Sequence, residues 1–357
     1  NENFLKNISW INLLKLRASW GKTGQDNLGS SLYGSYAPNN FKVNFSDNGI
    51  INIPYVSMGA NYPDVSWQKT TMKNIGLDFY LLSDRISGSF DFFRNDITRL
   101  LGYASTSPLA IYETRPINGG HYYRRGWELM VDTKNLVGEF TWDTSLTFSK
   151  TNSFWKERLP NYDYQIYQQR ENEPMSAYYY YNVTGIINTD RSNMPESQKT
   201  LQAEAQLPGC PIIEDKNKDG KIDENDVYMK DNSPAIYVGI GNTFTYKRFE
   251  FSFFMYGQFG IQKYNIAYSA AQAGPLAVDY PENSNKFAYR LWNSQTNPNG
   301  SRPGLAIGKM GALPGNAWVN ADRENASFMR MRNITLAYNL AGNILGSLQR
   351  YVRNIKV

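Results

Sequence analysis

Alternation of apolar and polar side chains with a period of two most constrains how this chain can fold. In the stretch FTWDTSLTFS, Phe140, Trp142 and Phe148 fall on one face, and mostly Thr, Ser and Asp fall on the other. Such alternation needs a strand with one apolar and one polar environment. Several of these runs reach about ten residues, which suits a tilted membrane-spanning strand, whereas strands of soluble sandwiches usually have about five or six. We therefore predict an all-β, antiparallel transmembrane barrel.

Short and long connections alternate along the chain, as they do at the two rims of such a barrel. Tight turns are predicted at 83–84, 135–138 and 247–248, and long loops at 21–70, 101–121, 151–236 and 260–326. Nine crossings are predicted near 13–20, 72–82, 86–99, 125–134, 140–150, 237–247, 249–259, 327–340 and 349–357. The alternation requires 151–236 to be a single excursion on the long-loop side. The strand-like stretch AYYYYNVTGI (177–186) is then not a crossing.

Composition excludes several other classes. The chain has a mean hydropathy of −0.54 and no apolar run of about 18 residues, so helical membrane spans are excluded. Its net charge of +5 comes from scattered basic residues, which argues against nucleic-acid binding. The lone His121 excludes a multi-histidine zinc site, and the lone Cys210 excludes an internal disulfide. No catalytic carboxylate pair or nucleotide motif stands out, and we predict no enzyme.

The stretch DKNKDGKIDEND (215–226) has the spacing of a calcium loop. The predicted ligands are Asp215, Asn217, Asp219, the Lys221 carbonyl, Asp223 and Asp226. Gly220 stands where such loops turn sharply, and Ile222 stands where they are usually anchored to a core. Because the last position is Asp rather than Glu, we expect weak binding, and the ion would have a structural role. The alternative is an acidic, glycine-centred turn that holds no ion.

Aromatic residues of the long loops are the candidates for cargo contact. They are Tyr178, Tyr179, Tyr180, Trp292 and Trp318. Aromatic faces can stack on sugar rings or pack against peptides. The alternative for these residues is loop packing or the aromatic girdle of a membrane barrel. Glu173 and its charged neighbour Glu171 are expected to be solvated.

Five stretches, taken in order, resemble the SusC/RagA family of TonB-dependent outer-membrane transporters. They are LKLRASWGKTGQDNLG (14–29), the hairpin at 74–101, RRGWELMVDTKN (124–135), the stretch 208–260 with its calcium-like loop, and SFMRMRNITLAYNL (327–340). The resemblance implies that 1–357 is the C-terminal barrel portion of a 22-stranded, plugged barrel whose plug lies outside this chain. A start without Met, an end in RYVRNIKV and an odd strand count also suggest a piece of a longer protein.

The resemblance further implies a function. It is TonB-dependent uptake of oligosaccharides or oligopeptides across the outer membrane, together with a SusD-like surface lipoprotein and with transporter–lipoprotein pairs that can dimerise. The excursion 151–236 and its calcium-like loop would then be extracellular. Two alternatives remain open at this point. A soluble β-rich, calcium-dependent carbohydrate-binding protein would bury the apolar strand faces in a sandwich core, and a surface hydrolase would need a catalytic carboxylate pair.

Overall fold

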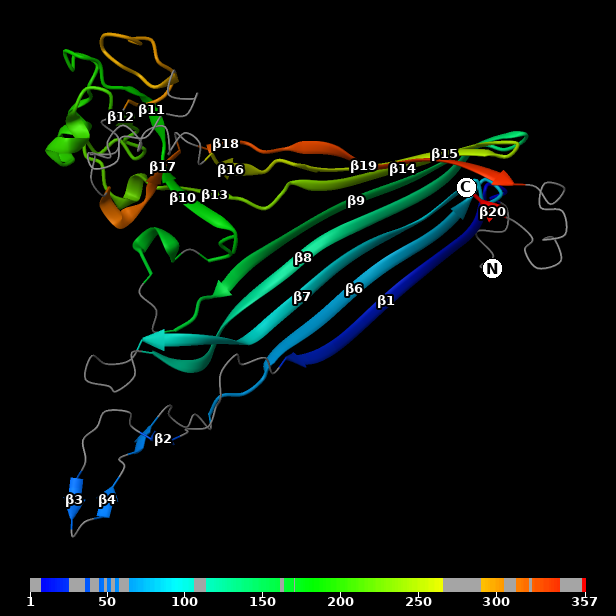
Figure 1. Ribbon diagram of the computed structural model, residues 1–357, viewed down its shortest axis with the longest axis horizontal. Coiled ribbons are helices and arrows are strands. Elements are labelled where there is room, and N and C mark those ends of the chain that lie inside the picture. The colour runs from blue at the N-terminus through cyan, green and yellow to red at the C-terminus, as the bar shows by residue number, and fades with distance from the viewer. Residues whose placement is uncertain are drawn as a thin grey trace.

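The structure, a computed structural model, describes most of the chain (Figure 1). The described residues are 8–25, 36–38, 45–47, 50–52, 55–57, 64–105, 114–160, 164–169, 171–265, 290–304, 313–320, 323–340 and 355–357. No helix among them is long and apolar enough to cross a membrane.

A nine-stranded antiparallel sheet forms one long wall. Its strands, in order across the sheet, are β1 (Ile11–Gln25), β6 (Gln68–Leu81), β7 (Ile86–Ser105), β8 (Thr114–Leu136), β9 (Phe140–Glu157), β14 (Ile236–Tyr246), β15 (Phe249–Phe259), β19 (Phe328–Leu340) and β20 (Ile355–Lys356). Every pairing between neighbours is antiparallel. The nine predicted crossings are confirmed as strands of one sheet, although most of the last predicted one, 349–357, lies outside the described residues.

The two ends of the wall differ in their connections. Short turns at 82–85, 137–139 and 247–248 lie at one end, and the smaller elements lie at the other end (Figure 1). The smaller antiparallel strand pairs are β2 (Tyr36–Pro38) with β5 (Tyr55–Ser57), β3 (Phe45–Asp47) with β4 (Ile50–Asn52), and β16 (Gln262–Tyr264) with β18 (Arg323–Asn325). Between β9 and β14 the chain makes one excursion that adds no strand to the wall, as predicted.

Several strands are longer than predicted. The β7–β8 ladder continues to the pair of Ser105 and Thr114, inside the predicted loop 101–121. β9 continues to Glu157, so the excursion begins at 158 rather than 151. Strand pairing uses backbone hydrogen bonds and therefore tolerates many kinds of side chain. Once the partner strand is in place, a segment with the composition of a loop can still pair with it.

Apolar side chains cover one face of the wall in cross-strand rows. One row consists of the directly paired residues Leu16, Leu77, Phe90, Leu129, Phe148 and Val238. Paired residues project to the same side of a sheet. Trp127 stacks on Phe90 in this face, and Leu16 remains 75% exposed. Within the described residues no second layer buries these rows, which a soluble sandwich would require.

The opposite face of the wall is polar. Arg17 on β1 forms ion pairs of 2.9 Å with Asp78 on β6 and with Asp91 on β7. The wall therefore has one apolar face and one polar face, as the strands of a transmembrane barrel do.

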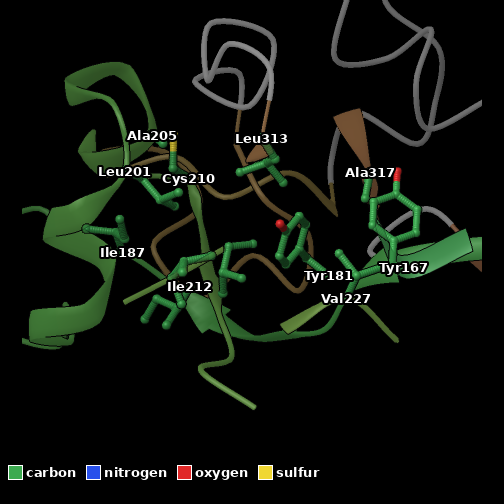
Figure 2. Packing of buried hydrophobic residues seen from close by; sticks show 12 residues of the cluster. Tyr167, Tyr181, Ile187, Leu201, Ala205, Cys210, Ile212, Val227, Leu313 and Ala317 are labelled. Carbon is green, nitrogen blue, oxygen red and sulfur yellow. The ribbon is translucent and has the colours of Figure 1, made fainter. Parts of the chain in front are cut away.

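The excursion folds into a small unit with its own core. Its elements are η1 (Ile166–Gln168), β10 (Ala177–Tyr181), β11 (Val183–Ile186), η2 (Glu196–Thr200), η3 (Ala203–Gln206), β12 (Pro211–Ile213), η4 (Glu224–Asp226) and β13 (Tyr228–Asp231), joined by η8 (Pro314–Asn316) and β17 (Trp318–Val319) from the later loop. We call the described parts of 158–235, 290–304 and 313–320 the rim module. Its core contains Tyr181, Ile187, Ile212, Val227 and Leu313 (Figure 2).

Candidate functional site

The loop 215–226 has the turn that its sequence predicts. Gly220 has φ +87°, a left-handed conformation that glycine adopts without strain. The carboxylate of Asp215 accepts hydrogen bonds from the amides of Asp219 at 3.2 Å and Gly220 at 2.9 Å. The Asp219 carboxylate in turn accepts a hydrogen bond from the amide of Lys221 at 3.0 Å, and the side-chain oxygen Oδ1 of Asn217 accepts one from the backbone amide of Asp219 at 3.1 Å. These local bonds fix the side-chain oxygens of three predicted ligands around the turn.

The Asp226 side chain joins the two ends of the loop through hydrogen bonds to its backbone. The side chain is fully buried and accepts hydrogen bonds of 2.8 Å from the amides of Lys216 and Asp223. Ile222 is 4% exposed and belongs to the module core, as predicted for its loop position. Within the described residues no three His, Cys, Asp or Glu side chains converge on one point. An oxygen that accepts one hydrogen bond keeps a second lone pair, so the donor set fits calcium in its chemistry, and calcium stays a prediction.

The tyrosine run divides between the two faces of β10. Tyr179 and Tyr181 face the module core, where the Tyr181 hydroxyl lies 2.9 Å from the Asp223 carbonyl oxygen. Tyr178 and Tyr180 project to the other face, where their rings stack at 5.3 Å. The period of two along a strand produces this division. The predicted cargo residues Tyr178 and Tyr180 therefore lie on the face of β10 opposite to Tyr179.

The outer pair of tyrosines belongs to an aromatic ladder. Tyr180 stacks on Tyr228 of β13 at 5.7 Å. The Arg323 guanidinium lies over the Tyr178 ring at 3.4 Å, and the Tyr178 hydroxyl donates to Gln262 Oε1 at 2.6 Å. Arg323 belongs to β18 and Gln262 to β16, which pair with each other. These contacts pack Tyr178 against the β16–β18 strand pair, and cargo contact by Tyr178 stays a prediction.

A groove of about 690 Å³ opens between β11 and the segment 290–304. β11 forms one side of it, and Trp292 and 298–303 form the other. Side-chain amides of Asn188, Asn193 and Asn320 also line it. Two of these amides bind the backbone of β11, since Asn193 donates to the Ile186 carbonyl at 2.8 Å and Asn320 accepts from the Val183 amide at 3.1 Å. Hydrogen bonds within the rim module therefore hold the lining of the groove in place.

The Trp292 side chain is held in place at this groove by packing. Its six-membered ring packs on Gly209, where an added Cβ would come within 2.9 Å of Cε3, and Gly209 has φ +89°. Both the space and the conformation at this position require glycine. Trp318 pairs through its backbone with Tyr180, while its side chain lies outside the described part. Among the predicted cargo residues whose side chains the structure describes, Trp292 alone lines the groove.

A buried charge cluster in the rim module was missed by the sequence analysis. Glu173 is 1% exposed, and its carboxylate binds the Arg158 guanidinium and the Tyr179 hydroxyl. The expectation that Glu173 is solvated is therefore wrong. Burial raises the pKa of Tyr179, and the bond to Glu173 raises it further, so this phenol stays protonated. A run such as Glu171-Asn172-Glu173 has no periodicity from which burial of one member could be predicted.

The cluster lies where the rim module rejoins the wall. The Trp155 amide of β9 donates to the Glu173 carbonyl, and the Met175 amide donates to the Ser153 carbonyl, both at 2.8 Å. Asn152 of β9 donates to Asp231 at 2.8 Å. The rim module is thus attached to the edge of β9 by backbone and side-chain bonds.

The single cysteine belongs to the module core. Cys210 is fully buried, and burial raises the pKa of its thiol to about 11. A thiol with this pKa is unreactive at neutral pH while the module is closed.

Comparison with known proteins identifies relatives across nearly the whole chain. The TonB-dependent receptor P3 of Formosa agariphila is 25% identical over 359 residues, which cover 97% of this chain and 34% of that protein. The TonB-dependent receptor SusC of Bacteroides thetaiotaomicron is 27% identical over 347 residues, which cover 94% of this chain and 32% of that protein. The chain spans about a third of the length of these curated relatives. No protein-family model matches it.

Solved structures show the same fold. The RagAB peptide importer in its closed-closed state matches with a TM-score of 0.69 at 17% identity, over 99% of this chain and 37% of that one. A second RagAB peptide transporter structure matches with the same TM-score at 16% identity. None of these relatives or structures carries the name of an enzyme, in agreement with the prediction. The motifs, the antiparallel wall and the named relatives agree: the chain is similar over nearly its whole length to TonB-dependent receptors, SusC among them, and it has the antiparallel barrel-wall fold of the RagAB structures.

Proposed function

We propose that this chain contributes barrel wall and an external rim module to a transporter that imports nutrients across the outer membrane. The cargo would be oligosaccharides or oligopeptides. Energy would come through TonB, and a SusD-like lipoprotein would deliver the cargo at the outer surface. Support comes from the names of the relatives, which include SusC and the RagAB peptide importer.

The observation that carries the proposal is the division of the wall into an apolar and a polar face. Trp142 is 36% exposed and Leu16 is 75% exposed on the apolar face. Exposed apolar rows of this extent on a sheet are stable when lipid covers them. The alternative of a soluble carbohydrate-binding protein predicts that these side chains are buried against a second sheet, and their exposure argues against it.

The proposal is tested by uptake in cells that produce the whole protein. Cells that carry the gene should accumulate labelled oligosaccharide or oligopeptide, and cells that lack it should not. Uptake should stop when an uncoupler collapses the proton gradient, because TonB draws on that gradient. Purification from native membranes in detergent should recover a surface lipoprotein together with the receptor.

Two results would contradict this function. One is recovery of the whole protein as a folded, monodisperse species without detergent. The other is cargo accumulation that continues unchanged after the proton gradient has been collapsed.

We also propose that the loop 215–226 binds calcium with a structural role. Asp215, Asn217, Asp219, Lys221, Asp223 and Asp226 would supply the oxygen ligands. An ion that binds only the ordered loop stabilises that loop, because it has no comparable site in the unfolded chain. The loop sits on the core through Ile222, so the stabilisation would extend to the rim module.

Calcium is expected to protect the loop from trypsin. Lys216, Lys218 and Lys221 are exposed cleavage sites within it. In the whole protein, after removal of calcium with a chelator, cleavage at these lysines should slow as calcium is added, with a midpoint of about 10⁻⁴–10⁻³ M. Asp215→Ala should abolish the protection. Glu196→Ala, a change at an exposed acidic residue outside the loop, should preserve it.

Unchanged cleavage rates with calcium about tenfold above this range would show that the loop holds no ion. Equal protection by calcium in the Asp215→Ala protein would place the ion elsewhere in the molecule.

A further inference from the structure

The groove beside Trp292 has a lining with little net charge. Its polar groups are mainly the side-chain amides of Asn188, Asn193, Asn299 and Asn320 and the hydroxyl of Thr184. The only formally charged residue in the lining, within the described part of the chain, is Arg302. Arg302 is paired with Glu324, with Nη2 3.0 Å from Oε1. The lining that the structure describes therefore offers no uncompensated charge to the end groups or charged side chains of a peptide.

The amides of the groove are held in place by the protein itself. The Asn193 side chain accepts a hydrogen bond from the backbone amide of Asn188 at 3.0 Å and donates to the Ile186 carbonyl. Asn320 accepts from the Val183 amide and donates to Asn182 Oδ1 at 2.8 Å. A primary amide has two N–H groups and two lone pairs, so each of these side chains keeps a donor and an acceptor after these bonds. Groups fixed in this way lose little entropy when a ligand binds.

Trp292 adds a rigid apolar surface beside the fixed amides. Gly209 and Gly304 support the indole, and an added Cβ at either glycine would meet it or its backbone within 2.9 Å. The indole is only partly buried and lines the groove. An aromatic face beside groups that both donate and accept matches a sugar, which has an apolar ring face of C–H groups and a rim of hydroxyls.

We propose that this groove binds a neutral oligosaccharide, with one sugar ring against Trp292 and its hydroxyls on the asparagine amides. The volume of about 690 Å³ lies within the range of small-ligand sites. This inference rests on the proposed uptake function and assigns the glycan class to one site of the rim module. The fixed, neutral amides favour a glycan over a peptide, whose charged groups would find no partner.

The test uses the whole protein in detergent and saturation-transfer NMR. The probes are a set of neutral hexasaccharides, of glucose, mannose and xylose in α and β linkages, and a random hexapeptide library. At least one hexasaccharide should bind, and Trp292→Ala should weaken its affinity by about tenfold. Asn299→Ala, at an exposed lining residue, should weaken it by a smaller factor. Ile166→Ala, at an exposed module residue outside the groove, should leave it unchanged.

Three results would overturn the inference. They are the absence of hexasaccharide binding at millimolar concentration, hexasaccharide binding that is unchanged in both Trp292→Ala and Asn299→Ala, and hexapeptide binding that is lost in Trp292→Ala. The uptake assay separates this failure from failure of the proposed function. Any of these three results together with gradient-dependent uptake would refute only the groove assignment, whereas the absence of any such uptake would refute the transport function itself.

Discussion

Replacing Phe148 with Arg is expected to lower the free energy of unfolding of the whole protein in a bilayer by about 2–4 kcal/mol. Phe148 lies near the middle of β9, in the apolar row between Leu129 of β8 and Val238 of β14. If this row faces lipid, a guanidinium there must be drawn out of water or must reach a bilayer surface. Urea titration of the protein folded into lipid vesicles measures the change, and less folded protein should also reach the outer-membrane fraction of cells.

Thr147→Arg is the matched control for this substitution. Thr147 is the adjacent residue on β9, and it projects to the polar face, where it pairs with Met130 and Gly239. Because successive side chains of a strand point to opposite faces, the same charge placed one residue away should remain in water. We expect a change of less than about 1 kcal/mol for Thr147→Arg. Equal losses for the two variants, or a larger loss for Thr147→Arg, would refute the assignment of the lipid face.

The wall could be predicted from the sequence because a half-exposed strand leaves a local signal. Period-two alternation placed Phe148 and Trp142 on one face before any pairing was known, and the alternation of short and long connections excluded 177–186 as a crossing. The strand ends could not be predicted in the same way. Residues 114–121 are rich in Gly, Pro and Asn, yet they pair with β7. Their strand conformation depends on the partner strand rather than on their own side chains.

The core of the rim module could not be predicted from the sequence in this way. It joins residues that are far apart in the sequence, such as Tyr181 and Leu313, and no local pattern connects them. Ile222 could be predicted as a core residue because the spacing of the calcium-like loop defines its position. The alternation along AYYYY could have shown that Tyr178 and Tyr180 share a face. Which of the two faces is buried depends on segments that sequence reasoning did not place beside it.

Tyr181→Ala should open the rim module while leaving the wall assembled. The Tyr181 side chain is fully buried at the centre of the core, and its hydroxyl lies within 3.0 Å of the carbonyl oxygens of Asp223 and Pro314 (Figure 2). Truncation of a buried aromatic side chain costs about 3–5 kcal/mol through lost contacts and the remaining cavity. Tyr181→Phe keeps the ring and should cost only about 1 kcal/mol for the hydrogen bonds.

Alkylation of Cys210 gives a direct measurement of this opening. The thiol lies in the same core, and alkylation requires a thiolate. At pH 8 the closed module should react slowly, because burial raises the thiol pKa from 9.0 to about 11. Tyr181→Ala should increase the labelling rate of the Cys210 peptide, followed by mass spectrometry, by about 10²-fold or more. The raised pKa also means that the closed module loses stability as pH rises from about 9 to about 11, since the opened form releases its proton first.

Tyr178→Ala separates the two faces of β10 in the same assay. Tyr178 lies outside the core and contacts Arg323 and Gln262 instead. Its loss should raise Cys210 labelling by less than about tenfold, because the contacts removed are those of a partly exposed side chain. A labelling rate in Tyr181→Ala equal to that of the unsubstituted protein would show that the module is not held by this core. Loss of the folded barrel in Tyr181→Ala would show instead that module and wall fold as one cooperative unit.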